Sequence, residues 1–468
     1  MPTTPCIAEA RFDFHPERSI HIRFDAPETS SDGGLLLLRQ VDDQLGLCAR
    51  LAAVVPDTRD PSRVQHDRLE QFRQRVFQIA LGYEDQNDAQ ALRQDPMWKT
   101  ACDRLPADHG GLSSQPSLSR FEHAVDARAV VRMQRELEDE YVASLPSDTS
   151  DVVLDIDSTD DPTHGQQPFA FFHGHYDQWM YFPLLVFDGE GRLVSARLRP
   201  GDAGNNKYAT ALVTRLVRKL KKRFPHAMIV LRADSGFCNS RLLDALDQLD
   251  REFGDVHYVL GLEKNKRLLA KDQVIVAMAM AKAKFEARIG AARCFDSFLY
   301  GAGSWSRERL VIVKAEHLEG GPNPRFVVTT LDHIPASMVY EQGYCGRGDA
   351  ENRIKDFKRA LAGDRLSDTT YVANAFRLLL HVTAYRLIDT LRSKVAVVAP
   401  SLGRAQFDTL RLRLLKVAAR VKQTVRRIWV HLPQTFGLAA VFVAVAQAMG
   451  AEAEARPESD PRNAAVPV

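Results

Sequence analysis

The chain has 468 residues, 45% of them hydrophobic, which is enough for about two to four domains with sizeable cores and excludes wholesale disorder. Its 62 Lys and Arg residues nearly balance its 60 Asp and Glu residues, and the net charge of +2 excludes a uniformly basic, histone-like protein. Contacts with nucleic acid must therefore come from local basic patches.

The sequence favours the cytoplasm. The six cysteines form no Cys-x-x-Cys pair, which argues for free thiols in a reducing cytosol and against disulfides or a zinc site. The N-terminal residues lack the apolar segment of a signal peptide, and the longest apolar run, Leu438 to Val445, is far too short to span a bilayer. We therefore expect a cytoplasmic protein without membrane contact.

Residues 1–146 are expected to form a mostly helical N-terminal region. Two short alternating stretches before residue 28 predict a strand pair. Apolar residues at helical spacing then predict helices over 33–55, 63–82 and 88–94.

The stretch SSQPSLSRFEH, residues 113–123, has a clear helix start. Ser114 fits the N-cap position and Pro116 fits the first turn. With Arg120 facing outward, this helix is compatible with a helix-turn-helix motif in which Arg120 contacts DNA. An ordinary packed helix explains the same pattern equally well.

From residue 150 the pattern changes to alternating strands and helices, and the first part of a catalytic core is expected over 150–263. The segment VVLDIDST is an apolar strand that ends in Asp155 and Asp157, and MIVLRADSG is a second strand that delivers Asp234. Other elements expected here are strands at 179–188, 192–199 and 256–262 and helices at 205–222 and 240–250.

The gap from Asp234 to the next candidate carboxylate, Glu351, is 117 residues (351 − 234), too long for a direct connection. Two strand-like runs in this gap predict a β-rich insertion over 264–335. Trp305, flanked by two arginines, is a candidate for stacking on an unpaired base. The alternative is a tryptophan that packs in a core.

Residues 336–398 are expected to carry the second part of the core. In YCGRGDAENRIKDFK, the residues Tyr344, Arg347, Glu351 and Lys358 follow at offsets of 3, 4 and 7, which brings them to nearly one face of a helix. The result is a carboxylate ringed by an aromatic hydroxyl and two cations. The alternative is a structural ion-pair network with nearby acids.

Residues 399–450 are expected to form C-terminal basic helices, and 451–468 a disordered tail. Apolar residues at helical spacing predict a helix over 404–428 with the strongest basic face of the chain. This face could hold DNA, pack on a partner subunit or, as a third option, lie on a membrane surface.

Two strand-end aspartates and one helical glutamate make a three-carboxylate site. Oxygen-only ligand sets suit Mg²⁺ or Mn²⁺ rather than zinc. The sequence therefore predicts a divalent-metal site at Asp157, Asp234 and Glu351.

This order, with the glutamate inside Tyr-x2-Arg-x3-Glu-x6-Lys, resembles the DDE-type insertion-sequence transposases, in the branch with the same Tyr/Arg/Glu/Lys signature. The phrases TSSDGGLLLLRQVD, LDIDSTDDPTHGQQ, LRPGDAGN and RADSGF look like the same group, and the resemblance spans about residues 20 to 435. It implies a mixed α/β fold: an RNase H-like catalytic core with the β-rich insertion, preceded by an α-helical DNA-binding region and followed by C-terminal helices.

The resemblance also implies the chemistry. Related enzymes bind terminal inverted repeats, cleave phosphodiester bonds with two divalent ions and join 3′-OH ends to target DNA by cut and paste, as dimers in a synaptic complex. Asp157 is assigned as the ligand that bridges the ions, with Asp234 and Glu351 each holding one. Asp157 is chosen over Asp155 because the family motif continues with a small hydroxyl residue and Thr.

The DNA-binding candidates are Tyr344, Arg347 and Lys358, by analogy with relatives, together with Trp305 and Arg120. Two other functions fit part of the pattern. An RNase H-like nuclease would cleave without strand transfer, and a catalytically silent protein would only bind DNA.

Overall fold

The computed structural model describes residues 10–26, 28–271, 273–286, 294–318 and 321–452. The chain divides into two compact units, each built from separate stretches of sequence. The first unit consists of Met1–Leu45, Asp85–Leu118 and Thr390–Val468, and the second of Gly46–Glu84 and Ser119–Asp389.

The second unit is built around an eight-stranded sheet with the order β12-β13-β16-β11-β10-β4-β8-β9. Strand β10 runs parallel to both of its neighbours, β4 and β11, and the other neighbouring pairs are antiparallel. The strands are β4 (Asp151–Ser158), β8 (Leu184–Asp188), β9 (Leu193–Arg197), β10 (Met228–Ala233), β11 (Val256–Leu262), β12 (Cys294–Tyr300), β13 (Arg309–Ala315) and β16 (Arg325–Thr329).

The described α-helices are distributed over both units. They are α1 (Leu35–Leu45), α2 (Leu47–Ala53), α3 (Arg68–Leu81), α4 (Ala89–Leu92), α5 (Pro96–Ala101), α6 (Gln115–His123), α7 (Ala127–Ser144), α8 (Ala209–Arg223), α9 (Ser240–Phe253), α10 (Lys266–Lys271), α11 (Gln273–Glu286), α12 (Ala336–Met338), α13 (Gly348–Lys355), α14 (Tyr371–Val398), α15 (Pro400–Gly403), α16 (Phe407–Leu410) and α17 (Ala439–Ala448). Among the helices that the structure describes, none combines the length and the apolar composition needed to span a bilayer.

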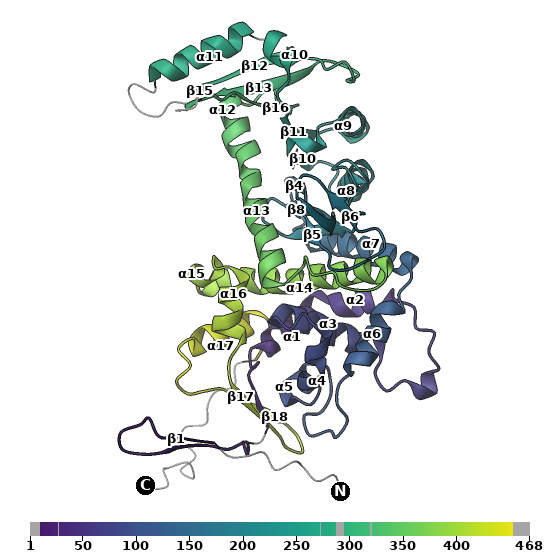
Figure 1. Cartoon of the computed structure of the whole chain (residues 1–468), viewed down its shortest axis with the longest axis vertical. Coiled ribbons are helices and arrows are strands. Elements are labelled where there is room, and N and C mark those ends of the chain that lie inside the picture. Colours follow the sequence, from purple (N-terminus) through teal and green to yellow (C-terminus); the bar gives the residue numbers. More distant parts are fainter. Residues whose placement is uncertain (1–9, 27, 272, 287–293, 319–320, 453–468) are drawn as a thin grey trace. The chain divides into compact units, whose positions relative to one another are not determined.

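Both faces of the central sheet are covered. Successive side chains of a strand point to opposite faces, and the buried residues of β10 divide accordingly. Ile229 and Leu231 belong to the core formed with α8 and α9, whereas Val230 packs in a cluster with Val339 and Tyr340. Figure 1 shows α8 and α9 on one side of the strands and the helical segment with α12 and α13 on the other.

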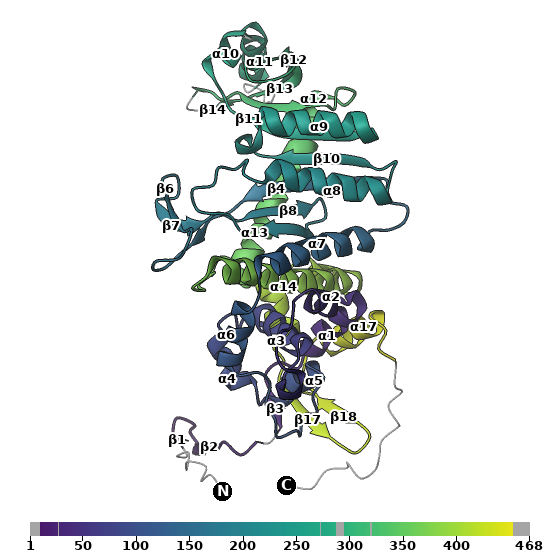
Figure 2. The same cartoon turned by 90° about the vertical axis from the view of Figure 1, so that its right-hand side faces the viewer.

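A smaller sheet follows directly after β4. It has the order β5-β7-β6, with antiparallel pairing between β5 (Asp161–Pro162), β7 (Gln178–Tyr181) and β6 (Phe171–His173). In Figure 2, the β6–β7 hairpin extends beyond the ends of the central strands.

The first unit contains a three-stranded sheet, β18-β17-β3, formed by β18 (Ile428–His431), β17 (Ala419–Gln423) and β3 (Thr29–Ser30). The buried carboxylate of Asp32 links the segment after β3 to α5 and to the residues before β17. It accepts hydrogen bonds from Trp98 Nε1 and from Lys416 Nζ, both at 2.9 Å. The remaining strands are β1 (Ala10–Phe12) and β2 (Ile20–Ile22), which form an antiparallel pair as predicted, and the short pair β14 (His317–Leu318) and β15 (Gly321–Pro322).

Most elements predicted for the core are confirmed, including the strands that end in Asp157 and Asp234 and the helix α9. The single strand predicted over 179–188 is wrong, because the chain forms two strands, β7 and β8, on either side of Pro183. Proline lacks the amide hydrogen that a continuous ladder requires.

The helix predicted over 404–428 is also wrong, since this stretch contains α16 and then strand β17. Its apolar residues recur every four positions, at Val417, Val421 and Val425. This spacing keeps side chains on one face of a strand as well as of a helix, so the pattern could not distinguish the two.

Two further differences concern helices. The single helix predicted over 33–55 divides at Gly46, which has a left-handed backbone with φ of 62°. The segment 264–335, predicted to be β-rich, also contains α10 and α11, and the run of alanine, methionine and lysine in α11 favours a helix.

Candidate active site

Two aspartates leave the same edge of the central sheet on neighbouring parallel strands. In the register between β4 and β10, Ile156 pairs with Ala233, so Asp157 and Asp234 are the next residues along the two strands. Ile156 and Ala233 belong to the core on the α8–α9 face. Strand alternation therefore directs both aspartates to the opposite face.

Asp234 has a second role in the turn that follows β10. Its side chain accepts a hydrogen bond from the amide of Gly236 at 2.9 Å and so caps the short helical turn Ser235–Phe237. This cap fixes the position of the carboxylate at the strand end.

The segment from Ala336 to Ala360, which crosses this face, is helical but not one regular α-helix. Two π-helical stretches, Val339–Tyr344 and Asp356–Ala360, flank α13, and a 3₁₀ turn lies between the first stretch and α13. A π turn holds more residues than an α turn, and such insertions often occur at functional sites. The offsets of 3, 4 and 7 therefore do not define one straight helical face.

This helical segment brings Arg347 to the first aspartate. Nη1 of Arg347 donates a hydrogen bond to Oδ2 of Asp157 at 3.1 Å, and its Nη2 lies 4.0 Å from Oε1 of Glu351. The side chains of Asp157 and Arg347 are 14% and 16% exposed, whereas that of Glu351 is 60% exposed. One guanidinium thus lies between a buried and a solvent-facing carboxylate.

Burial and neighbouring charges both act on the Asp157 carboxylate. Burial raises its pKa from 3.8 to about 6, and the negative charges of Asp234 and Glu351 act in the same direction. Arg347 and the amide of Ser158 oppose this rise. Burial therefore makes the ionised form of Asp157 less favourable than that of a carboxylate in water.

Tyr344 lies against the second aspartate. A Cβ atom added to Gly261 on β11 would lie only 2.7 Å from the Tyr344 hydroxyl, so glycine is needed for this close approach. Burial raises the pKa of Tyr344, and Asp234 contributes to the rise while Arg347 opposes it. The Arg347 guanidinium lies 5.8 Å from the centre of the tyrosine ring.

Asp155, the competing aspartate on β4, is paired elsewhere. The guanidinium of Arg232 on β10 donates two hydrogen bonds to it, each 2.6 Å long, and both residues are buried. Such a bidentate pair uses both carboxylate oxygens in a structural contact. Sequence analysis missed Arg232, although its position two residues before Asp234 on an alternating strand places it on the same face.

Lys358 lies in the second π-helical stretch. Its Nζ donates a hydrogen bond to Oδ1 of Asp160 at 2.6 Å and lies 3.5 Å from Oδ2 of Asp364. Asp160, which sequence analysis did not select, therefore links the strand end after β4 to the helical segment.

The other two DNA-binding candidates are not part of this cluster. Trp305 packs, partly buried, against the core on the α8–α9 face and meets the ring of Tyr300 edge-on at 5.6 Å. Its flanking Arg307 and Arg309 both form ion pairs with Asp247 on α9. Arg120 is exposed on α6.

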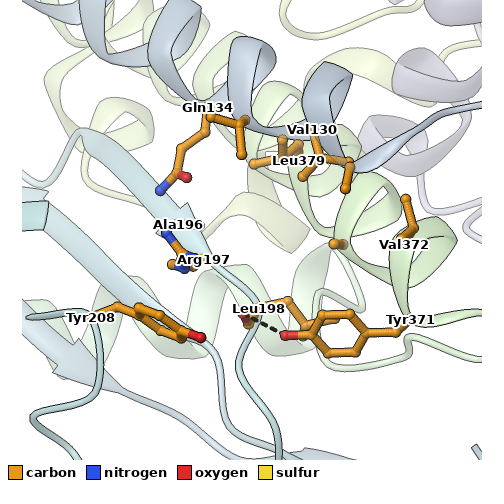
Figure 3. Close-up of a pocket in the computed structure, with 12 residues that line it drawn as sticks. Val130, Gln134, Ala196, Arg197, Leu198, Tyr208, Tyr371, Val372 and Leu379 are labelled. Carbon is orange, nitrogen blue, oxygen red and sulfur yellow. Dashed lines mark hydrogen bonds between the residues drawn. The ribbon is translucent and has the colours of Figure 1, made fainter. Parts of the chain in front are cut away.

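The cavities of the second unit include one that borders the candidate site. This cavity, of about 500 Å³, borders the carboxylate cluster through Ser235 and Tyr344 and is also lined by Lys264, Lys314 and Arg325. Another, of about 180 Å³, is a mainly apolar pocket between α7, β9 and α14, where the Tyr371 hydroxyl donates a 2.8 Å hydrogen bond to the carbonyl of Leu198 (Figure 3). None of the three carboxylates lines this second pocket.

The cluster matches a divalent cation in the chemistry of its donors, which are all carboxylate oxygens. A bound cation would also offset the burial and, to a smaller extent, the charge repulsion that raise the pKa of Asp157. Within the described residues, however, no three His, Cys, Asp or Glu side chains are close enough to hold one ion together. The arrangement is a charge cluster rather than a closed ligand set.

Comparisons with known proteins found one family model and similar solved structures. A solved structure described as "Cryo-EM structure of piggyBac transposase synaptic complex with hairpin DNA (SNHP)" is similar, with a TM-score of 0.43 and 12% identity over 81% of this chain and 78% of that chain. No curated protein sequence matches the chain. The family model described as "Transposase DDE domain group 1" matches residues 12–453. The chain therefore belongs to the family of transposase DDE domains, group 1.

Proposed function

We propose that this transposase is the cut-and-paste enzyme of an insertion sequence, with Asp157, Asp234 and Glu351 as its catalytic carboxylates. The observation that carries the proposal is the position of Asp157 and Asp234 at the ends of adjacent parallel strands, with Arg347 and Glu351 on the helical segment beside them.

The strand order supports an RNase H-like core. Read from one edge of the central sheet, β9, β8, β4, β10 and β11 are in the order 3-2-1-4-5 of their sequence, with the first three antiparallel and the last two parallel to β4. The first aspartate then lies on the first strand of the core and the second on the fourth, as in the predicted fold.

DDE transposases generally use divalent metal ions. Asp157, Asp234 and Glu351 would hold two Mg²⁺ or Mn²⁺ ions, which when bound would activate water and stabilise the leaving oxygen. Asp157, whose pKa is influenced by the charges of both Asp234 and Glu351, would be the ligand shared by the ions. Glu351 would complete the ligand set, since its exposed side chain has room to reorient.

The positive groups around the carboxylates would hold DNA phosphates. Arg347 and Lys358 present cations on the helical segment, and Tyr344 adds a hydroxyl. The adjoining 500 Å³ cavity is lined by both signs of charge, with Glu263 and Glu316 beside three cations. Lys314 pairs with Glu316 at 2.8 Å, so Lys264 and Arg325 are the cations that would contact the backbone of a strand leaving the site.

The partners of this reaction are double-stranded element ends and target DNA. The N-terminal region, including Arg120, would bind the terminal inverted repeats, and a homodimer in the cytoplasm, associated with the nucleoid, would hold the two ends together. The packed position of Trp305 argues against a stacking role for this residue.

Strand cleavage and joining on a labelled element-end duplex with Mg²⁺ test the proposal. We expect joined products from the wild type and none from Glu351→Ala or Asp157→Asn. Cleavage without joining would favour an RNase H-like nuclease, and binding without cleavage would favour a silent DNA-binding protein. Cleavage that survives Glu351→Ala would overturn the three-carboxylate assignment.

A further inference from the structure

An aromatic hairpin lies beside the carboxylate cluster. Phe172 on β6 pairs with Trp179 on β7, so the two rings share one face of the hairpin, with their centres 6.4 Å apart. These side chains are 52% and 58% exposed, and Phe169 and Phe171 nearby are also exposed. Large aromatic residues normally fill cores, so a solvent-facing group of them marks an interaction surface.

The hairpin is fixed to the site by hydrogen bonds. Nε2 of Gln178 on β7 donates to Oδ2 of Asp160 at 3.0 Å, while the other oxygen of Asp160 accepts from Lys358. Tyr176, in the turn, is close enough to Asp157 and Asp234 for their charges to add to the effect of burial in raising its pKa. The hairpin therefore borders the carboxylate cluster through Tyr176 and Gln178, and strand alternation directs Trp179 to the face opposite Gln178.

The composition of the hairpin identifies what it binds. Residues 169–182 contain seven Phe, Tyr or Trp residues, two His and one Asp, but no Lys or Arg. A surface without cations is poorly suited to a phosphate backbone or an anionic membrane. Exposed rings instead match the flat faces of unpaired bases, which stack on aromatic side chains irrespective of sequence.

We propose that Phe172 and Trp179 form a stacking platform for unpaired bases of the DNA strand that enters the carboxylate site. The platform rests on the proposed function, because that function supplies the strand. The bases would stack on this outer face of the hairpin, and the phosphates of the nucleotides beyond its edge would reach Arg347 and Lys358. The base-stacking role that the sequence suggested for Trp305 would then belong to the β6–β7 hairpin.

Binding measured by fluorescence anisotropy, with EDTA present so that no cleavage occurs, tests the platform. The probes are a labelled oligothymidine of about 16 nucleotides and a fully paired duplex of the same length. We expect Phe172→Ala and Trp179→Ala each to weaken oligothymidine binding about five- to 100-fold and duplex binding less than about twofold. Trp179→Phe should retain most of the affinity, and Phe285→Ala, at an exposed aromatic on α11, serves as the matched control.

Equal weakening of both probes, or no change in either, would overturn the platform. Loss of self-association in sedimentation velocity, with unchanged DNA binding, would instead assign the hairpin to an interface between copies of the chain. A second measurement uses only the wild type, in case the variants misfold. Photo-crosslinking with 5-iodouracil in the oligothymidine should map to residues 171–181, and a crosslink confined to other segments would contradict the proposal.

These results separate the two proposals. If the wild-type protein crosslinks through the hairpin but does not cleave DNA with Mg²⁺, the proposed function is wrong and the platform is supported. Cleavage and joining by variants whose oligothymidine binding is unchanged would remove the platform and keep the function.

Discussion

Arg347 and Asp157, which are 190 positions apart in sequence, are joined by a 3.1 Å hydrogen bond between Nη1 and Oδ2. The arginine supplies positive charge at the place where the proposed function requires a metal ion. The Arg347 guanidinium and the proposed metal ion would therefore compete for the Asp157 carboxylate, and this competition can be measured.

Replacing Arg347 by glutamine should tighten Mn²⁺ binding while impairing cleavage. Loss of one nearby positive charge should strengthen metal binding about tenfold at about pH 8, where Asp157 is ionised. Cleavage should fall because the proposed contact of Arg347 with a DNA phosphate would be lost. Isothermal titration calorimetry and the cleavage assay measure the two effects, and Lys355→Gln, at an exposed position of α13, is the control. Weaker metal binding in Arg347→Gln would show that the arginine supports the ligand rather than competing for it.

Asp157 should make the metal-free protein less stable as the pH rises. Its folded pKa of about 6 lies above the ordinary 3.8, so the folded chain binds this proton more tightly than the unfolded chain. The resulting stabilisation is present below about pH 4 and is lost as the pH rises to about 6, a loss of up to about 3 kcal/mol. Asp157→Asn should thus be more stable than the wild type at neutral pH and equally stable in acid. Urea unfolding across this range measures the difference, and a constant difference would contradict the raised pKa.

Glu351→Gln should abolish cleavage without changing stability. The side chain is mostly exposed, so its replacement should alter the free energy of unfolding by less than about 0.5 kcal/mol. The matched control is Asp349→Asn, since Asp349 is an exposed acid in the same first turn of α13. Loss of cleavage in both variants would indicate a general effect of helix charge instead of metal ligation.

Variants of the Lys358–Asp160 pair can distinguish a structural role of Lys358 from a DNA-binding role. Burial alone would raise the pKa of Asp160, but its contacts with Lys358 and Gln178 lower it. Lys358→Ala should therefore cost about 1–3 kcal/mol, because it leaves Asp160 and Asp364 without this cation. Adding Asp160→Ala should recover part of the stability. Recovery of cleavage in the double variant would show that Lys358 only stabilises the fold. We expect cleavage not to recover, because Lys358 is proposed to contact DNA.

In the first unit, Lys416→Met should reduce stability by about 2–3 kcal/mol, because the buried carboxylate of Asp32 loses this cation. Lys422→Met, on an exposed position of β17, should change stability by less than about 0.5 kcal/mol. Urea denaturation of the two variants provides the comparison. Equal effects would mean that the Asp32 contact carries little stability.

The family was predictable from the sequence, because the motif around Glu351 and the strand-end aspartates are local patterns. The strands ending in Asp157 and Asp234 were predictable for the same reason, since apolar runs with a polar end define buried strands. The roles assigned to these residues remain predictions.

The partners of the charged residues were not predictable. Asp155 is held in an ion pair by Arg232, 77 positions later in sequence, which leaves Asp157 as the aspartate of the candidate site. The partner of Lys358 is Asp160 on a distant strand end. Such pairs arise from tertiary register, which a single sequence does not display. The aromatic hairpin was missed because hydrophobic rings in a sequence normally indicate burial.

Strand β16, from the segment between Asp234 and Glu351, pairs directly with β11, and β13 and β12 continue the same sheet. This segment is therefore an integral part of the central sheet and not a separate domain. A shortened enzyme without this segment would have β11 as an exposed hydrophobic edge strand, which could pair with other chains. Miniaturised versions of the protein should keep these strands and be trimmed elsewhere.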